Sequence, residues 1–391
     1  MPRTTTDPPA PPPAKVAKAP TNSYPFWALR FWAGMRTRAY FGMLARNGYR
    51  IHPARWAMAL IYAQMAPWNS GLHRIQQLAL GGKIRRAEIK RPPIFIIGHW
   101  RSGTTHLHEL MIRDERFAYP TTYECFAPHH FLITGWVLPK LFHFLLPRKR
   151  PMDNMRAGFQ RPQEDEFGMV AMGAPTTYYR TAFPNEPVPG MDTLNSRDFS
   201  AADRASFRGA LTYFMRALTV KNQKRLVLKS PPHTGRVEML AEWFPGAKFV
   251  HISRHPYAIF PSMKHTWAAL DEAQGFQFRT DYGAAMDAFI HDCYERMYKG
   301  FDQQRASVAP GDWCEVRYED VAADPVGQVE SIYDRLDLAG FEHARPTLES
   351  YAASLREYKP NKLDIEPSIK KQIDERWAWY LKRFGYEKAY D

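Results

Sequence analysis

Residues 93–105, Pro-Ile-Phe-Ile-Ile-Gly-His-Trp-Arg-Ser-Gly-Thr-Thr, join a short apolar run to a turn that contains two glycines. The run Ile94–Ile97 lies between prolines and a glycine, which is typical of a buried parallel strand. Residues 106–111 then have the composition of a helix. In such a strand–turn–helix connection, glycine allows backbone N–H groups to converge on an anion at the helix N-terminus. The sequence therefore predicts an anion-binding loop at residues 98–105.

The loop has the spacing of the nucleotide-binding P-loop, G-x4-G-K-[ST], but Thr104 stands where that motif has its lysine. Transfer from a triphosphate requires this lysine and Mg²⁺ to neutralise developing charge. A sulfuryl group has one negative charge fewer than a phosphoryl group, so a few N–H donors and one cation suffice without a metal. Arg101 is the natural cation. A P-loop kinase or nucleotide hydrolase is the alternative; against it, two later expected strands end in Lys229 and Arg254 rather than in an acid.

Residues 93–105 resemble the 5'-phosphosulfate loop of sulfotransferases that use PAPS (3'-phosphoadenosine 5'-phosphosulfate), which is usually G-x-P-[RK]-S-G-T-T. His99 and Trp100 replace the x-Pro pair. The resemblance implies that the 5'-phosphate and the sulfate are held by Arg101, Ser102, Gly103, Thr104 and Thr105.

Two later segments support this resemblance. Residues 249–263 are similar to the 3'-phosphate segment of the same family, with Arg254 and Ser262 eight residues apart at its arginine and serine positions. An arginine contacts phosphate through two parallel N–H groups, and a hydroxyl adds one more donor. Residues 316–325 resemble the family stretch R-Y-E-D-L-x-x-D-P, which we interpret as structural.

The resemblance covers roughly residues 91–340, and one family element is missing from it. Cytosolic sulfotransferases complete the 3'-phosphate site with R-K-G near the C-terminus, where this chain has only Lys359 and Lys362. Either lysine could substitute, and surface solvation is the alternative role for both. The chain resembles the bacterial and Golgi or tyrosylprotein-type branches more than the cytosolic branch.

Candidate catalytic groups follow from the same comparison. Lys229, at the end of the second expected strand, matches the lysine of the K-T-H-L-P motif in cytosolic sulfotransferases and of the K-D-P motif in tyrosylprotein sulfotransferases. This resemblance implies that Lys229 acts at the oxygen that bridges the sulfate and the 5'-phosphate. The alternative is a strand-end lysine that points into solvent. An acceptor hydroxyl has a pKa far above 7 and benefits from a base. Glu124 lies twenty-three residues beyond Arg101, near the position of the tyrosylprotein-branch glutamate, and we expect it to be that base.

Four other groups compete for the role of base. Glu164, Asp165 and Glu166 are consecutive acids before an apolar stretch, and His233 follows Lys229 by four residues. The alternative for the three acids is a structural one, because acids in the first turn of a helix complement its dipole.

Further apolar runs at 226–228, 249–252 and, more weakly, 313–317 alternate with helical stretches at 203–220 and 235–243. This alternation predicts an α/β fold of the P-loop type, with three layers and a central parallel sheet flanked by helices. Helices are also expected at 328–337 and 366–384. We expect a disordered tail at 1–20, a helical N-terminal region at 21–90 that ends at Gly81-Gly82, and a sulfotransferase domain at 91–391.

The net charge of +13 lies entirely within residues 1–91, which contain fifteen Lys/Arg and two acids. Basic residues interleaved with aromatic ones suit the anionic face of a membrane. A helical cap with solvated arginines is the alternative, and no nucleic-acid motif accompanies the charge. Together with the apolar stretch 131–146, which we interpret as a buried or interfacial helix, this region favours a lipid, glycolipid or other amphiphile as the acceptor. A non-catalytic relative is disfavoured because Arg101, Lys229 and Arg254 are all present.

Location is predicted from cysteine usage and from the absence of targeting patterns. The three cysteines have no metal-ligand spacing and suit a reducing compartment. Neither a signal peptide nor a run of 18 apolar residues is recognisable. We therefore expect a cytoplasmic enzyme without a metal cofactor, with residues 21–90 as the candidate contact to the inner face of the membrane.

Overall fold

The computed structural model describes residues 24–25, 27–147, 157–355 and 364–387. The predictions for the tail at 1–20 and for Lys359 and Lys362 lie outside these residues. Five parallel strands form one sheet in the order β2-β3-β1-β4-β5. Their bounds are β1 (Ile94–Ile97), β2 (Phe117–Ala118), β3 (Arg225–Lys229), β4 (Lys248–Ser253) and β5 (Trp313–Arg317). The predicted parallel α/β fold is confirmed, and the two-residue strand β2 is an addition to it.

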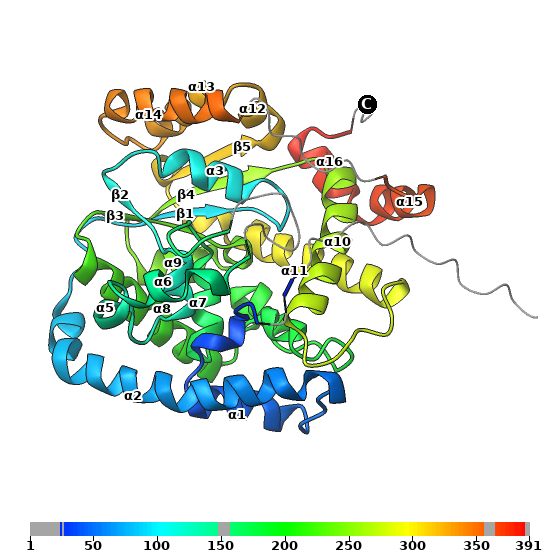
Figure 1. Ribbon diagram of the computed structural model, residues 1–391. Helices are drawn as coiled ribbons and strands as arrows, with labels where there is room; N and C mark the ends of the chain where they lie inside the picture. The colour runs from blue at the N-terminus through cyan, green and yellow to red at the C-terminus, as the bar shows by residue number, and fades with distance from the viewer. Residues whose placement is uncertain (1–23, 26, 148–156, 356–363, 388–391) are drawn as a thin grey trace, which may run out of the picture.

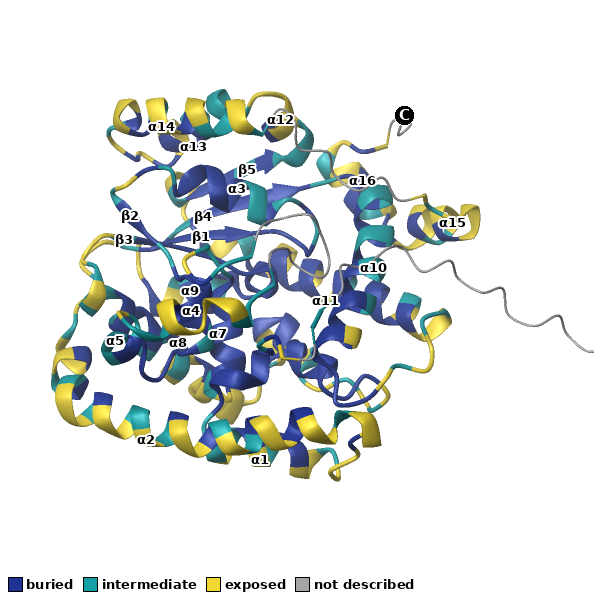
Figure 2. Cartoon of the chain, viewed as in Figure 1, coloured by how far each residue is buried: buried dark blue, intermediate teal, exposed yellow. Residues whose placement is uncertain are grey.

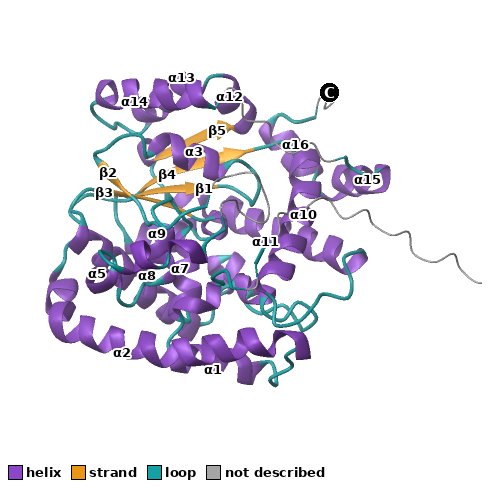
Figure 3. Ribbon diagram, viewed as in Figure 1, coloured by secondary structure: helices purple, strands orange, loops and turns teal. Residues whose placement is uncertain are grey.

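Both faces of the sheet are covered, as the continuous apolar sequence of β1 requires. Ile94 and Ile96 point to one face, where α3 (Thr104–Met111) and the helices at the top of Figure 1 pack. Phe95 and Ile97 belong to the larger core on the opposite face. The helices at the top are α12 (Tyr318–Ala323), α13 (Pro325–Arg335) and α14 (Phe341–Ser354). The three-layer prediction is therefore confirmed, and Figure 3 shows the strands between the helical layers.

The second helical layer supplies most of the walls below the sheet. Its longer helices are α7 (Asp165–Met172), α8 (Ala201–Lys221), α9 (Val237–Trp243), α10 (Pro256–Gln274) and α11 (Ala284–Gln304). Its shorter elements are α4 (Thr122–Phe126), η4 (Thr177–Thr181), η5 (Met191–Leu194), η6 (Ser196–Asp198), η7 (Pro231–Gly235), η8 (Arg305–Ser307) and η9 (Pro310–Asp312). The predicted helices at 203–220 and 235–243 correspond to α8 and to η7 with α9.

The N-terminal region is helical, as predicted, and consists of η1 (Phe31–Gly34), α1 (Thr37–Arg46), η2 (Pro53–Arg55) and α2 (Trp56–Arg86). The predicted end at Gly81-Gly82 is wrong, because α2 continues through both glycines. A glycine in a helix costs only about 1 kcal/mol, and Gly81 is buried where an added Cβ would lie 2.8 Å from Gln77 Oε1. Packing therefore outweighs propensity at this point.

Two other predicted helices are divided in the structure. Residues 131–146 form α5 (Phe131–Thr134), α6 (Leu138–Leu141) and η3 (His143–Leu145), and the C-terminal helix is split at Trp377 into α15 (Pro367–Arg376) and α16 (Ala378–Phe384). Within the residues that the structure describes, every helix is too short or too polar to cross a bilayer.

Strand order decides where a ligand site can form. β1 lies between β3 and β4, so the chain leaves β1 towards one edge of the sheet and later returns to its other side. In open parallel sheets, ligands bind beyond the carboxyl ends of the strands at such a switch point. The loop after β1, the residues that end β3 and those that follow β4 meet there.

Candidate active site

The loop between β1 and α3 has the backbone that its glycines predict. Gly98 and Gly103 have φ of +145° and +102°, and a Cβ at Gly103 would collide with the ring of Tyr318. Arg101 adopts a φ of +67°, which is uncommon for a residue with a side chain and marks functional sites more often than ordinary turns. Because α3 begins here without a side-chain cap, the N–H groups of its first turn are available to an anion.

The predicted phosphate-binding side chains lie together beside this loop. Arg101 Nε donates to Ser262 Oγ at 2.8 Å, and Arg254 Nη1 donates to the carbonyl oxygen of Arg101 at 3.0 Å. The guanidinium of Arg254 stacks 4.1 Å from the centre of the Tyr318 ring. Arg101 and Arg254 thus bring two positive charges from different elements to this loop, an arrangement that a bound anion would stabilise.

The donor set fits a phosphosulfate. Ser102 is fully buried and its Oγ has no hydrogen-bond partner among the described residues, so an anion in the loop would supply one. Gly103 allows close approach of the backbone, and Thr104 and Thr105 add hydroxyl groups. Within the described ranges, no group of three or more His, Cys, Asp or Glu is arranged to hold a metal ion.

Lys229 closes the other side of the loop. It is buried at the end of β3, and its Nζ lies 3.3 Å from Thr105 Oγ1 and 2.7 Å from Glu164 Oε1. The register that pairs Ile96 with Lys229 places this side chain level with the end of β1. The structure therefore brings the predicted lysine to the loop after β1, together with one of the competing acids.

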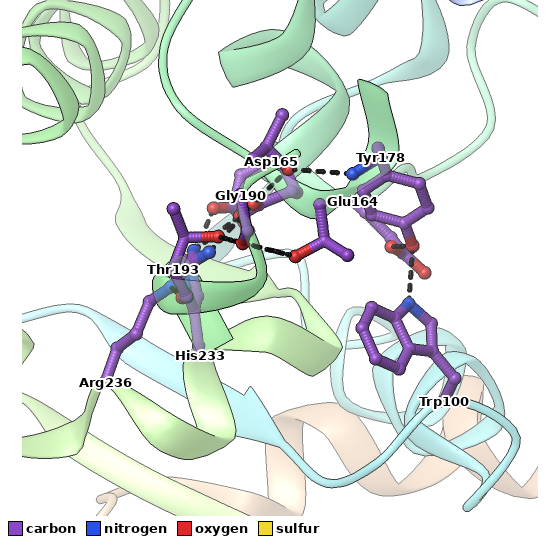
Figure 4. Close-up of polar contacts among 11 residues, drawn as sticks. Trp100, Glu164, Asp165, Tyr178, Gly190, Thr193, His233 and Arg236 are labelled. Carbon is purple, nitrogen blue, oxygen red and sulfur yellow. Dashed lines mark hydrogen bonds and ion pairs between the residues drawn. The ribbon is translucent and has the colours of Figure 1, made fainter. Parts of the chain in front are cut away.

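Each of the three consecutive acids forms a buried pair with a different basic side chain, and Figure 4 labels two of these partners, His233 and Arg236. Glu164 pairs with Lys229; Asp165 Oδ2 lies 2.7 Å from His233 Nε2; Glu166 accepts from Arg236 at 2.7 and 3.1 Å. Burial by itself would raise the pKa of Asp165, but the neighbouring His233 holds it below its usual value. The acids therefore anchor the start of α7 to β3 and to the segment around η7, and Glu164 is the one of the three that hydrogen-bonds to Lys229.

A hydrogen-bonded chain orients Glu164 from the side opposite Lys229. Tyr178 Oη donates to Glu164 Oε2 at 2.7 Å and accepts from Trp100 Nε1 at 2.7 Å. Burial, followed by the charge of Glu164, raises the pKa of the Tyr178 hydroxyl well above its usual value, so it stays protonated and donates. One carboxylate oxygen thus faces Tyr178 and the other faces Lys229.

Glu124 lies in a different set of contacts. Its Oε2 accepts from the backbone N–H of Thr121 at 2.7 Å, which completes a capping box at the start of α4, and its Oε1 pairs with Lys221 at 2.5 Å. Both contacts are ones that stabilise a helix end. The assignment of Glu124 as the base stays a prediction, and its side chain makes no hydrogen bond to Lys229 or to the described loop residues.

Two site residues were not recognised as such from the sequence. Tyr318 belongs to the segment that we interpreted as structural, yet its ring packs against both Gly103 and Arg254. Tyr178 lies in η4 without any motif around it. A sequence signal for Tyr178 existed at Trp100, which replaces the usual proline of the loop. The indole N–H of Trp100 donates to the Tyr178 hydroxyl oxygen.

Comparison with known proteins gives the family. The model of the "Sulfotransferase family" matches residues 92–343, which include the loop, Lys229, Arg254 and Tyr318. The chain belongs to the sulfotransferase family. This sulfotransferase is 38% identical over 362 residues to omega-hydroxy-beta-dihydromenaquinone-9 sulfotransferase Stf3 of Mycobacterium bovis and of Mycobacterium tuberculosis, covering 93% of this chain and 92% of each relative. The aligned length exceeds the length of residues 91–391, so the similarity extends into the N-terminal region.

Solved structures agree on the fold of this sulfotransferase. Sulfotransferase STF1 from Mycobacterium tuberculosis and STF9 from Mycobacterium avium both superpose with a TM-score of 0.59 at 17% identity. The matches cover 90% of this chain and 94% and 96% of the two relatives. Because the identity is low, these similarities bear on the fold alone.

Proposed function

We propose that this sulfotransferase transfers a sulfuryl group from PAPS to a hydroxyl group of a lipid-like acceptor. The observation that supports it best is the joint placement of Arg101, Ser262, Arg254 and Lys229 around a glycine-rich loop. These groups provide positive charge at two neighbouring places, as a donor with a 5'-phosphosulfate and a 3'-phosphate requires.

The loop residues would hold the 5'-phosphosulfate, and Arg254 with Ser262 would hold the 3'-phosphate. When bound, PAPS supplies a sulfuryl group attached to a phosphate leaving group. The Arg101 side chain donates to Ser262, and its backbone carbonyl oxygen accepts from the Arg254 guanidinium, so Arg101 would link the two phosphate subsites. The Tyr318 ring lies against the Arg254 guanidinium and would help to position it.

In this proposal, Lys229 and Glu164 would act on opposite ends of the transfer. Lys229 would stabilise the charge that develops on the leaving phosphate oxygen. Glu164 would accept the proton of the acceptor hydroxyl as its oxygen bonds to sulfur and the bond from sulfur to the phosphate oxygen breaks. Glu164 is favoured over Glu124 because it contacts Lys229 directly, whereas Glu124 contacts Thr121 and Lys221.

Asp165, Glu166 and His233 are less suited to the role of base. Asp165 and His233 are fully buried and bond to each other, and both oxygens of Glu166 accept from Arg236. Their role would be to fix the positions of Glu164 and Lys229 relative to each other.

The acceptor is proposed from the relative and from surface chemistry. Stf3, named for a hydroxylated dihydromenaquinone, is similar over almost the whole chain. The segment after α5 exposes large apolar side chains that suit an isoprenoid or other apolar chain. They are Trp136, Leu141, Phe142 and Phe144. We therefore place the acceptor hydroxyl on a lipid of the isoprenoid-quinone type.

An acceptor screen with ³⁵S-labelled PAPS tests the proposal. The panel contains an ω-hydroxylated menaquinone, a long-chain alcohol, a phenol and a free sugar. We expect label on the hydroxylated menaquinone, with less on the long-chain alcohol and none on the sugar. Label on the free sugar alone would contradict the lipid acceptor, and absence of label from every acceptor would contradict the transfer itself.

A further inference from the structure

The outward face of α2 is largely apolar from Trp56 to Ala79, which is the reverse of an ordinary surface helix. Trp68 and Leu78 are 75% and 88% exposed. Further large apolar side chains on this helix and on neighbouring α1 are exposed by more than a third, namely Phe41, Trp56, Leu60, Ile61 and Ile75. A helix of 31 residues is about 46 Å long, so the face is far larger than a scattered apolar residue would create. Figure 2 shows exposed residues recurring along α2 at the bottom of the view.

The inward face of the same helix is firmly attached to the protein. Tyr40 Oη donates to the carbonyl oxygen of Ala59 at 2.7 Å, and Asn69 Nδ2 donates to the carbonyl oxygens of Ala33 and Met35 at 2.7 and 3.0 Å. The apolar outward face is therefore held rigidly in place, and it does not arise from a loosely attached helix.

Charge on this surface has a single sign. The sequence from residue 24 to residue 87 contains no Asp or Glu. Arg50 and Arg55 pair with Glu186 and Glu272 from elsewhere in the chain. Other exposed cations of α1 and α2 form no ion pair with any described residue. They are Arg38, Arg46, Arg74, Lys83, Arg85 and Arg86.

A second copy of the chain is a poor binding partner for this face. A twofold interface would place α2 against its own equivalent, and the cations on α2 would then face cations without an acid to pair with. A lipid bilayer with anionic headgroups satisfies both features at once, because its interface accepts large apolar side chains and its surface attracts Lys and Arg.

The surface also lies close to the candidate active site. Phe31 of η1 packs between α2 and α7, with its ring stacked 4.2 Å from that of Phe167 and in edge contact with Tyr178 at 6.1 Å. Tyr178 in turn donates to Glu164. η1 thus lies between the inward side of α2 and the wall of the candidate site.

We propose that the outward faces of α1 and α2 form a docking surface for the anionic face of a membrane, with α2 parallel to the bilayer plane. The docking surface is inferred from the exposed apolar and basic residues of α1 and α2, whereas its use in collecting a lipid acceptor rests on the proposed function. This surface would hold the enzyme where an acceptor with a long apolar chain is dissolved, so that the acceptor need not leave the bilayer completely.

Vesicle sedimentation of the full chain tests the surface. Vesicles of phosphatidylcholine with a third phosphatidylglycerol are compared with vesicles of phosphatidylcholine alone. We expect binding to the anionic vesicles that weakens in high salt. The variant Trp68→Ser/Ile75→Ser/Leu78→Ser should bind them at least about tenfold more weakly, and Arg74→Gln/Lys83→Gln/Arg85→Gln roughly 100-fold more weakly.

A matched control removes three exposed lysines from other elements, Lys299→Gln/Lys371→Gln/Lys382→Gln, and should leave vesicle binding unchanged. Circular dichroism checks that each variant is folded. Equal binding by the α2 variants and the parent chain, or no binding by the parent, would overturn the proposal. Self-association of the parent that the serine variant abolishes, without vesicle binding, would assign the face to a second copy instead.

Transfer to a detergent-solubilised acceptor is measured in parallel and separates this proposal from the proposed function. The α2 variants should retain that transfer, because none of the substituted residues contacts the site. Vesicle binding without transfer would leave the surface in place and contradict the function, whereas transfer without vesicle binding would contradict the surface alone.

Discussion

Replacing Glu164 by glutamine removes one negative charge from the candidate site while keeping its shape. The amide oxygen can still accept from Lys229, and the amide N–H can donate to the Tyr178 oxygen, so the two contacts at 2.7 Å have replacements. We expect the folded protein to lose about 1–3 kcal/mol, because a hydrogen bond between charged groups becomes a weaker one. The variant should therefore be folded at room temperature.

Activity should fall far more than stability does. A positioned general base contributes roughly 10²- to 10⁴-fold to a rate, and glutamine cannot accept the hydroxyl proton. We therefore expect kcat to drop by roughly 100- to 10,000-fold, with the affinity for 3'-phosphoadenosine 5'-phosphate unchanged, because Glu164 contacts no predicted phosphate-binding residue apart from its link through Lys229.

The assay measures ³⁵S transfer from PAPS at saturating acceptor, and calorimetry measures binding of the bisphosphate product. Glu124→Gln is the matched control: it should lose its Lys221 ion pair and some stability but keep most of kcat. A Glu164→Gln enzyme with full activity, next to an inactive but folded Glu124→Gln enzyme, would refute the assignment and restore Glu124 as the base.

Other substitutions test other parts of the account. Arg254→Lys should weaken binding of 3'-phosphoadenosine 5'-phosphate roughly 10- to 100-fold by calorimetry, since lysine cannot make the paired N–H contacts; unchanged affinity would remove Arg254 from the 3'-phosphate site. Gly103→Ala should cost about 1–3 kcal/mol in urea unfolding and weaken the same ligand, because its φ of +102° and the Tyr318 ring exclude a side chain. Burial, followed by the charges of Arg383 and Arg305, lowers the pKa of His251 to about 3. Below pH 6.5 the unfolded chain binds a proton at this histidine that the folded protein does not bind. The stability that depends on neutral His251 is therefore fully present above pH 6.5 and is lost as the pH falls towards 3. His251→Phe should therefore reduce the loss of stability below pH 6.5 by about 1.4 kcal/mol per pH unit in urea unfolding; an identical pH dependence would show that folding does not lower the pKa of His251.

The proximity of the proposed donor-binding residues could be predicted because their motifs are local in sequence. The glycines, Arg101 and the hydroxyl residues lie within one loop, and a strand before a helix is enough to place their N–H groups. Arg254 and Lys229 follow strands of the same sheet, and the ends of parallel strands meet at one edge. The topology thus converted three separate motifs into one site.

The choice between Glu164 and Glu124 as the base depends on packing between segments that are distant in the sequence, so a local motif could not decide it. Glu164 and Glu124 are both acids near the start of a short helix, so the pattern does not distinguish them. The difference appears only when α7 packs against β3, where Lys229 meets Glu164, while Lys221 at the end of α8 meets Glu124. Counting residues from the loop favoured Glu124, but that distance contains no information about which element returns to the strand ends.

The N-terminal region shows the opposite case, in which composition was informative and local propensity was misleading. Clustered arginines and aromatic residues indicated a special surface, whereas the pair of glycines indicated a helix end that the structure lacks. Tertiary contacts on the inner face of α2 keep the chain helical past Gly81 and Gly82. The outer face carries exposed aromatic and basic residues of the kind that the composition had indicated.

Calorimetry with the two candidate nucleotides tests the central claim, that the donor is PAPS. The full chain is titrated with 3'-phosphoadenosine 5'-phosphate without metal, and separately with ATP in the presence and absence of Mg²⁺. We predict tight binding of the bisphosphate that requires no metal and is weakened in Arg254→Lys. Tight binding of ATP that depends on Mg²⁺, with no binding of the bisphosphate, would contradict it.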